Sequence, residues 1–413
     1  MPEGHAAAQQ GSAARAVRLR RWAVTAVFVP LGAAEGTWAA RVPAIKADLH
    51  LSAGQLGLAL LGPALGCVLA MPAVAAVLAS IAPRRVVQVG LVLVGGLLPV
   101  TAVAGSGWQL FLVLTGWGAG IGMLDVGMNT EAADVQDKMG RRVMSTFHGA
   151  YSVGGLAGAG LGAIAAAAGL GVQATFIIAG IVIGVVGLIS SQAFAARPTP
   201  HAAGQQTAGR RKRRLPQWSW TLLALGAMSF ASFLGEGSAS NWSAVYLHSS
   251  LGASPALAAI GFTVFSATMT VGRLSGDWLA DRAGPVRLVR LFAGVAAAGF
   301  GGALLIGHVW SGLAGFGLLG VGLSVVVPLA FTAAAGLGQA GPNLAFVTSA
   351  GYLGSLAGPP AIGALADLTS LPAALGVVAV LSGLIVLLAG TVRPAASPAA
   401  RAAVSAGPPT DAR

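Results

Sequence analysis

The chain has 413 residues, of which 55% are hydrophobic and only 9% are charged. A soluble domain carries about 25% charged residues, so this chain has too few charges to cover a core of this size with a polar surface. The composition excludes an ordinary soluble protein and favours one that spans a membrane. The net charge of +12 does not indicate nucleic-acid binding, because the basic residues lie between long apolar runs. A single cysteine excludes a disulfide framework, and we expect no metal or cofactor.

Long apolar stretches recur along the whole chain. A helix needs roughly 20 apolar residues to cross the hydrocarbon core of a bilayer. Twelve stretches meet this requirement, so we predict an all-α membrane protein with twelve transmembrane helices. In chain order they are about 22–40, 54–79, 86–104, 108–130, 143–168, 172–194, 219–247, 257–280, 286–306, 310–336, 343–366 and 372–392.

The distribution of basic residues predicts the orientation of these spans. If the N-terminus is cytoplasmic, 21 of the 24 Lys and Arg residues fall in segments on the cytoplasmic side. Only Arg41 and Lys46 fall in outer loops, and Arg273 lies within a span. Cytoplasmic loops of membrane proteins carry such an excess of positive charge. We therefore predict a multi-pass protein of the cytoplasmic membrane with both termini inside.

Composition also divides the chain into two apolar halves and three polar segments. The segment between the halves contains Pro and Gly and a run of five basic residues, 210–214. We interpret this run as an anchor for lipid headgroups, with partner or nucleic-acid binding as the alternative. The predicted organisation is a cytoplasmic N-terminal tail (1–21), a six-helix bundle (22–194), a basic cytoplasmic linker (195–218), a second six-helix bundle (219–392) and a disordered tail (393–413).

The two halves resemble each other at an offset near 200 residues. Glu35-Gly36 in the first span matches Glu236-Gly237 in the seventh. The sequence GGLAG at 154–158 in the fifth span matches GSLAG at 354–358 in the eleventh. The order and spacing of these matches indicate two pseudo-symmetric six-helix bundles. Transporters with such repeats bind their solute at the interface between the halves.

A polar motif follows the eighth span, from Gly276 through Asp277, Asp281 and Arg282 to Gly284. It resembles the loop signature of the major facilitator superfamily: a glycine, variable residues, an aspartate, a basic residue and a glycine. The matching first-half loop, 75–85, keeps basic residues and lacks the acid. The resemblance extends over about 20–393 and implies the fold of that family, with alternating access and no enzymatic activity.

Acidic residues inside apolar spans are the first functional candidates, because an ionised side chain in hydrocarbon is unfavourable. Glu35 lies mid-span, with Trp38 one turn further along the same face. Asp125 lies in the fourth span, with Asn129 at i+4. We interpret Glu35 and Asp125 as proton carriers; the alternative is that they are neutral, hydrogen-bonded acids that tie helices together. The resemblance supports the first reading, since fucose–proton symporters are similar in placing acids in these two spans.

The remaining polar and aromatic residues of the spans are candidates for solute contacts. A histidine can relay protons or bind a hydroxyl, aromatic faces stack on rings, and amides orient a solute. Each also has a structural interpretation, as an interhelical hydrogen bond or an interface anchor. Together with Trp38 and Asn129, the predicted contacts are His148, Tyr151, Glu236, Asn241, Trp242 and Tyr352.

Arg273 and Asp277 are spaced i, i+4 near the inner end of the eighth span. We predict that they pair with each other. With Gly276, Asp281, Arg282 and Gly284 they would form a latch that controls the conformational change.

These residues favour a proton-coupled transporter of a small solute, sugar-like or another small metabolite. The expected partners are the solute, protons and the lipid bilayer, without nucleic acid, and we expect a monomer. The chain contains no phosphate-binding P-loop, so nothing in it supports transport driven by ATP. A proton-driven exporter of drugs or metabolites is the alternative, and a membrane sensor that transports nothing is a third.

Overall fold

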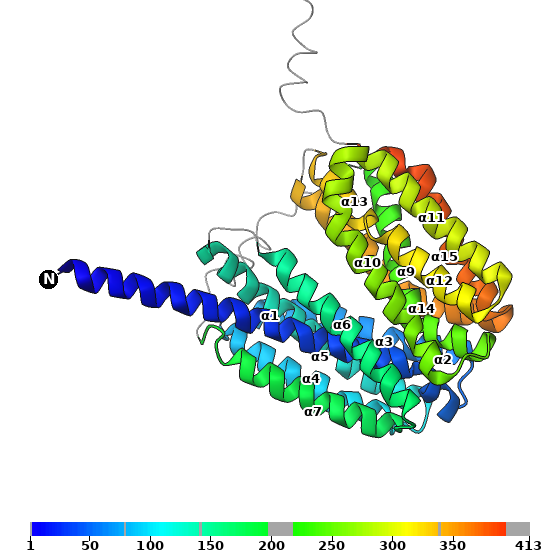
Figure 1. Ribbon diagram of the computed structural model, residues 1–413, viewed down its shortest axis with the longest axis horizontal. Helices are drawn as coiled ribbons and strands as arrows, with labels where there is room; N and C mark the ends of the chain where they lie inside the picture. Colours follow the sequence, from blue (N-terminus) through cyan, green and yellow to red (C-terminus); the bar gives the residue numbers. More distant parts are fainter. Residues whose placement is uncertain (1, 78–79, 140–142, 197–217, 338–339, 394–413) are drawn as a thin grey trace, which may run out of the picture.

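The computed structural model describes residues 2–77, 80–139, 143–196, 218–337 and 340–393, and all regular structure within them is helical (Figure 1). The elements are α1 (Pro2–Asp48), α2 (Ala53–Ala59), α3 (Leu61–Val77), α4 (Pro83–Thr101), α5 (Gly107–Met139), α6 (Met144–Ala167), α7 (Val172–Ser191), α9 (Trp220–Val245), η1 (Tyr246–Ser250), α10 (Pro255–Ala283), α11 (Pro285–Ile306), α12 (Val309–Leu323), α13 (Val326–Ala335), α14 (Ala340–Leu368), α15 (Leu371–Leu388) and η2 (Ala389–Val392).

Twelve helical crossings are present in the described part of the chain, as predicted. Eleven of them are long and apolar enough to span a membrane. The twelfth is α14, whose 29 residues include Gly, Ser and two internal prolines and are therefore less apolar. Two crossings are interrupted: α2 and α3 form the second, and α12 and α13 form the tenth.

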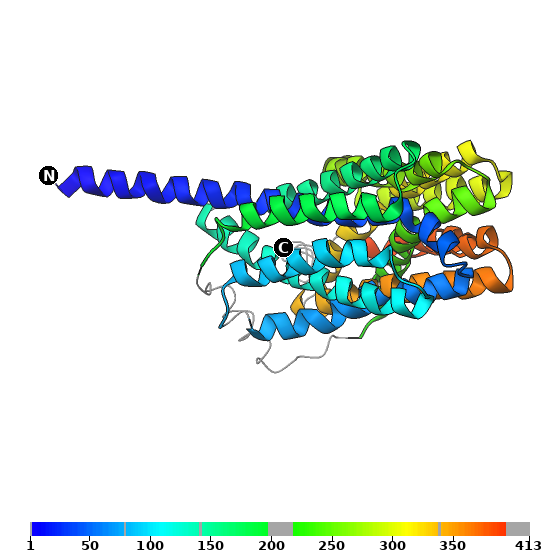
Figure 2. The same cartoon turned by 90° about the horizontal axis from the view of Figure 1, so that it is seen from below.

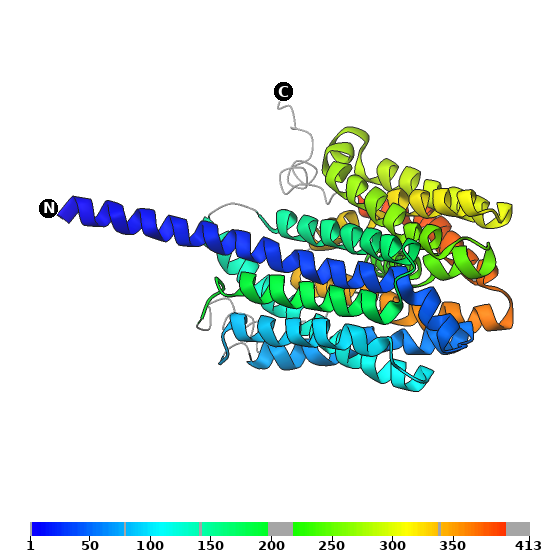
Figure 3. The same cartoon turned by 60° about the horizontal axis from the view of Figure 1, so that its bottom comes forward.

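The structure differs from the predicted domain boundaries at the N-terminus. Helix α1 begins at Pro2, so no helix end separates residues 2–21 from the first span. The beginning of α1 projects beyond the bundle (Figures 2 and 3). Its alanine-rich sequence explains the continuous helix, because alanine has the highest helix propensity. Most of the predicted linker, 197–217, and tail, 394–413, lie outside the described residues.

Glycine contacts show the predicted repeat in three dimensions. A Cβ atom added at Gly154 of α6 would lie 2.2 Å from the carbonyl oxygen of Val29 on α1. A Cβ atom at Gly354 of α14 would lie 2.2 Å from the carbonyl oxygen of Phe230 on α9. Each residue of the second pair lies about one repeat length further along the chain than its counterpart in the first. In both pairs a glycine lets the backbones of two helices touch. The halves are therefore built on the same helix–helix contact, α1 with α6 and α9 with α14.

The two halves touch most closely at the end of the bundle away from the beginning of α1. Here α2 packs against α14, while α6 meets α10 and α1 meets α9 along the interface. A Cβ atom at Gly57 would lie 2.6 Å from the carbonyl oxygen of Pro359, and one at Gly363 would lie 2.5 Å from that of Ala53. The halves diverge toward the other end (Figure 1). We call the α2–α14 contact the far-end gate.

A carboxylate reinforces this gate. Asp367, at the end of α14, accepts a hydrogen bond from the Ser52 hydroxyl at 2.7 Å and one from the backbone N–H of Gly54 at 2.9 Å. These bonds join the C-terminal half to the first turn of α2. Because they are exposed, water can replace them when the halves separate.

We predict that Gly363→Val opens the far-end gate, because its side chain would collide with the backbone of α2. In a Cys67→Ser background, spin labels at Val103→Cys and Ile306→Cys should report longer distances between the halves. Gly376→Val is the control, since a Cβ atom there has open space. An unchanged distance distribution for Gly363→Val, in folded protein, would show that this contact does not hold the gate closed.

A buried cluster of ion pairs fixes the other end of the N-terminal half. The guanidinium of Arg20 on α1 binds Glu131 of α5 at 2.5 Å and Asp134 at 2.7 Å. The side chain of Glu131 is fully buried and also accepts the backbone N–H of Ala195, after α7. Lys138 binds Asp134 from the next turn at 2.6 Å. The cluster therefore ties α1, α5 and the end of α7 together.

Removing the cation should leave Glu131 buried without compensation, which costs about 3–5 kcal/mol in buried pairs. We therefore expect Arg20→Gln to lower the midpoint of thermal unfolding in detergent. Arg18→Gln, at an exposed position of the same helix, should have little effect. Adding Glu131→Gln to Arg20→Gln should restore part of the loss, because no bare carboxylate remains. Equal midpoints for Arg20→Gln and Arg18→Gln would contradict this role.

Candidate functional site

A cavity of about 350 Å³ lies between the two halves and is lined by residues of both. Its N-terminal wall comes from α1, α3, α5 and α6, and its C-terminal wall comes from α9, α10 and α14. The predicted residues that line it are Glu35, Trp38, Tyr151, Glu236, Asn241 and Arg273. No group of three or more His, Cys, Asp or Glu side chains within the described residues has the geometry of a metal site.

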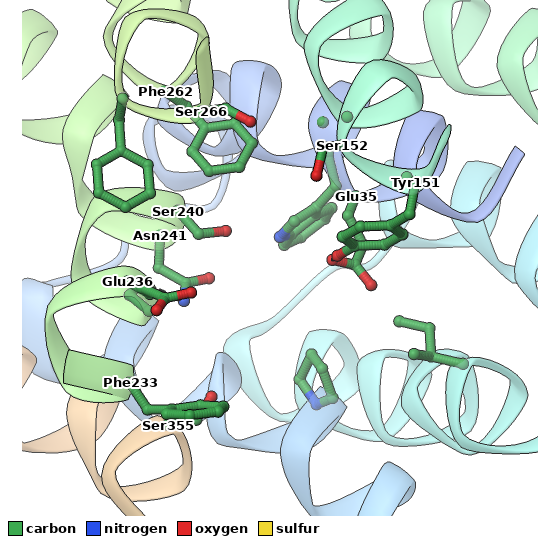
Figure 4. A pocket seen from close by; sticks show the side chains of 18 of the residues that line it. Glu35, Tyr151, Ser152, Phe233, Glu236, Ser240, Asn241, Phe262, Ser266 and Ser355 are labelled. Carbon is green, nitrogen blue, oxygen red and sulfur yellow. Dashed lines mark hydrogen bonds between the residues drawn. The ribbon is translucent and has the colours of Figure 1, made fainter. Parts of the chain in front are cut away.

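On the N-terminal wall, the Tyr151 hydroxyl donates a short hydrogen bond to the Glu35 carboxylate (Figure 4). Gly32 and Gly36 place the two helices in backbone contact on either side of this bond, because Cβ atoms there would lie 2.0 and 2.1 Å from carbonyl oxygens of α6. The glycines flanking Glu35 therefore position its carboxylate against the neighbouring helix. Among the described residues, no Lys, Arg or His forms an ion pair with Glu35.

Asp125 of α5 does not line the cavity. The side-chain amide of Asn129 donates to its carboxylate at 2.9 Å and to its backbone carbonyl at 2.8 Å. The predicted i, i+4 relation is therefore a direct contact. Within the described part of the chain Asp125 has no ion-pair partner.

On the C-terminal wall, Arg273 binds Glu236, with 2.9 Å between a guanidinium nitrogen and the carboxylate oxygen Oε2. The Arg273 guanidinium therefore lines the cavity and bridges α10 to α9, while its predicted pairing with Asp277 in a latch stays a prediction. The side chain of Asp277 lies outside the part of the chain that the structure describes. Glu236 and Asn241 face the Glu35–Tyr151 pair across the cavity (Figure 4).

Four predicted solute contacts do not line the cavity, and one of them is Asn129, which binds Asp125 instead. Trp242 is fully buried against neighbouring helices. His148 is exposed, and its ring packs edge-on against Phe28 with 5.4 Å between centroids. Tyr352 is 46% exposed and lies beside Phe233, which does line the cavity.

Several lining residues were missed in the sequence. Phe262, Ser266 and Thr270 of α10 all face the cavity, as does the predicted Arg273 on the same helix. Their spacings of 4, 4 and 3 residues place them on one helix face, and this polar stripe in an apolar span was the signal that could have identified them. Trp117 of α5 also lines the cavity, and its indole N–H has no hydrogen-bond partner among the described residues.

The predicted latch motif lies at the end of α10, outside the cavity. Asp281 and Arg282 are exposed, and the Arg282 guanidinium lies over the Trp278 ring at 3.9 Å. A Cβ atom at Gly276 would lie 3.2 Å from the side chain of Val325. Gly284 has φ +79°, which favours glycine, and it ends α10 and begins α11. The gating role of this motif stays a prediction.

Comparison with known proteins agrees with this architecture. The family model described as Major Facilitator Superfamily matches residues 24–341. An uncharacterized MFS-type transporter of Yersinia pestis is 35% identical over 86% of this chain and 91% of its own length. The membrane protein MosC of Rhizobium meliloti is 28% identical over 86% of each chain.

Two solved structures share the fold at low sequence identity. One is a bacterial homolog of the human lysosomal transporter Spinster, in an inward-facing and unoccupied conformation. It has a TM-score of 0.73 and 16% identity, covering 91% of this chain and 98% of that one. The other is the nucleoside transporter NupG, with a TM-score of 0.66 and 14% identity, covering 90% and 98%.

Proposed function

The chain belongs to the major facilitator superfamily of membrane transporters, and we propose that it couples the movement of a small polar solute to that of protons by alternating access. The observation that carries the proposal is the contrast between its intramembrane acids. Glu131 and Glu236 each have an arginine partner. Glu35 and Asp125 have none among the described residues and receive only neutral hydrogen bonds.

A buried carboxylate without a cation is stable in hydrocarbon only when it is protonated. Glu35 lines the solute cavity, so a proton bound there can enter and leave with the solute. The Tyr151 hydroxyl is able to donate to the ionised form and to accept from the protonated form. Asp125, near the same wall, is a second candidate for a proton carrier.

We also propose that the protein is a monomer of the cytoplasmic membrane with both termini inside. In this orientation the far-end gate faces outward, and its closure leaves the halves diverging toward the cytoplasm. The distribution of Lys and Arg supports this assignment.

We expect Glu35→Gln to retain solute binding and exchange but to lose accumulation driven by a pH gradient, because glutamine imitates the protonated acid at similar volume. Asp125→Asn should behave in the same way if it carries the proton, and as wild type if it does not. The measurement is solute flux in proteoliposomes with and without an imposed pH gradient. Tyr151→Phe should keep coupling but shift its pH dependence, since the hydrogen bond to Glu35 is lost.

Asp48→Asn is the control, because Asp48 is an exposed carboxylate at the C-terminal end of α1, away from the cavity. Accumulation driven by pH should be unchanged in this variant. If Glu35→Gln and Asp125→Asn both accumulate solute as wild type does, proton coupling through these acids is wrong. In the wild-type protein, the direction of solute accumulation under the imposed pH gradient distinguishes uptake from export. Accumulation in the alkaline compartment indicates uptake, and accumulation in the acidic compartment indicates export.

Orientation can be tested independently. A reporter that is active only in the cytoplasm, fused after Arg393, should be active, and the same reporter inserted after Ser106, between α4 and α5, should be silent. The opposite pattern would invert the assignment of the far-end gate and contradict the proposed topology.

A further inference from the structure

The Glu236–Arg273 pair differs from the other ion pairs of the described residues in its surroundings. The Arg20–Glu131 pair is buried, whereas 42% of the Arg273 side chain is exposed and its pair with Glu236 lines the solute cavity. Solvent-exposed ion pairs contribute about 0–1 kcal/mol to stability. Folding therefore does not account for an arginine placed within a membrane-spanning helix, where a charge is unfavourable.

The geometry of the pair leaves hydrogen-bonding atoms of both Arg273 and Glu236 available to a solute. One guanidinium nitrogen of Arg273 binds Oε2 of Glu236. A guanidinium has five N–H donors in a planar fork that matches a carboxylate with two parallel hydrogen bonds. The second oxygen of Glu236, Oε1, is buried and has no partner among the described residues. Buried polar atoms are nearly always hydrogen-bonded, so this acceptor is suited to a donor that arrives with the solute.

The rest of the cavity offers hydroxyl groups and one amide near this pair. Ser240 and Asn241 follow Glu236 on α9, and Ser266 and Thr270 precede Arg273 on α10. The unpartnered indole N–H of Trp117 lies on the opposite wall. These groups suit a solute rich in hydroxyls, and the guanidinium suits a negative charge.

We propose that the solute is a polyhydroxylated organic acid whose carboxylate binds Arg273 in place of Glu236. The solute carboxylate accepts two parallel hydrogen bonds from the Arg273 guanidinium. A neighbouring solute hydroxyl donates a hydrogen bond to the Glu236 carboxylate. This inference rests on the proposed function for its transport consequences, but not for the binding itself.

Charge balance links the solute to the proton. Glu236 and Arg273 together are neutral, so a bound monocarboxylate adds one negative charge to a cavity in the membrane. A proton taken up by the ionised Glu35 carboxylate offsets that charge, so the loaded cavity carries no more net charge than the empty one. Transport of one monocarboxylate with one proton moves no net charge.

The binding test compares acids with neutral counterparts of nearly the same shape. Purified protein in detergent is titrated with gluconate and sorbitol, and with glucuronate and glucose, at millimolar concentrations, while thermal unfolding is followed. At least one acid should stabilise the protein, and its neutral counterpart should not. Arg273→Gln should weaken binding of that acid by roughly tenfold or more, because a charged hydrogen-bond partner is lost. Arg273→Lys should lose less, and Glu236→Gln should bind the acid more tightly because the competing carboxylate is gone.

Arg287→Gln removes an exposed arginine from the beginning of α11 and is the charge-matched control, with binding expected as in wild type. Equal stabilisation by an acid and its neutral counterpart, no stabilisation by either acid, or undiminished binding in folded Arg273→Gln would each overturn the proposal. Uptake of the acid in proteoliposomes should follow a pH gradient and be insensitive to a potential imposed with valinomycin. Acid binding without pH-driven uptake would refute proton coupling but not the acidic solute. Uptake of a neutral sugar driven by the pH gradient would refute the acidic solute but not proton coupling.

Discussion

The cost of a carboxylate in hydrocarbon is the constraint on which the arrangement of polar residues in this protein depends. The structure meets it in three ways. Glu131 is fully buried and held by Arg20, which fixes helices of one half together. Glu236 is partly exposed to the cavity and bound by Arg273. Among the described residues Glu35 receives only the hydrogen bond of the Tyr151 hydroxyl, and in the proposed function a proton neutralises it. The partner of each acid therefore distinguishes the structural role of Glu131 from the proposed roles of Glu236 in solute binding and of Glu35 in proton coupling.

Backbone contacts through glycine connect this chemistry to the movement of the halves. Within the N-terminal half, Gly32 and Gly36 hold α1 directly against α6 around Glu35, so the Glu35–Tyr151 geometry travels with that half as a unit. Between the halves, Gly57 and Gly363 form a similar contact at the far-end gate. That contact is supplemented by exposed hydrogen bonds to Asp367, which water can replace when the halves separate. The same device thus builds a rigid half and a separable gate.

Hydropathy, charge asymmetry and the internal repeat were enough to predict the twelve crossings and the division into halves, because these properties are averaged over many residues. The faces of individual helices were harder to predict. Trp242 and Asn241 are adjacent in sequence, yet only Asn241 lines the cavity, since an apolar span shows little periodicity to orient it. Arg273 was assigned to Asp277 by the local i, i+4 rule, which does not reveal that its guanidinium binds Glu236 on another helix. Contacts between helices follow from packing, which local spacing does not contain.

The two halves of the repeat differ in the residues that contact their equivalent glutamates. Glu35 and Glu236 occupy equivalent places in α1 and α9, and at the repeat offset of 200 residues Tyr151 corresponds to Gly351. A Cβ atom at Gly351 would lie 2.7 Å from the Ser229 hydroxyl and 2.8 Å from the Phe233 ring, so α14 has no room for a tyrosine there. Glu236 therefore lacks the neutral hydroxyl partner that Glu35 has, and it is bound instead by a cation from α10. The two equivalent acids therefore have a neutral partner in one half and a cationic partner in the other, which supports assigning proton binding to the N-terminal half and solute binding to the C-terminal half.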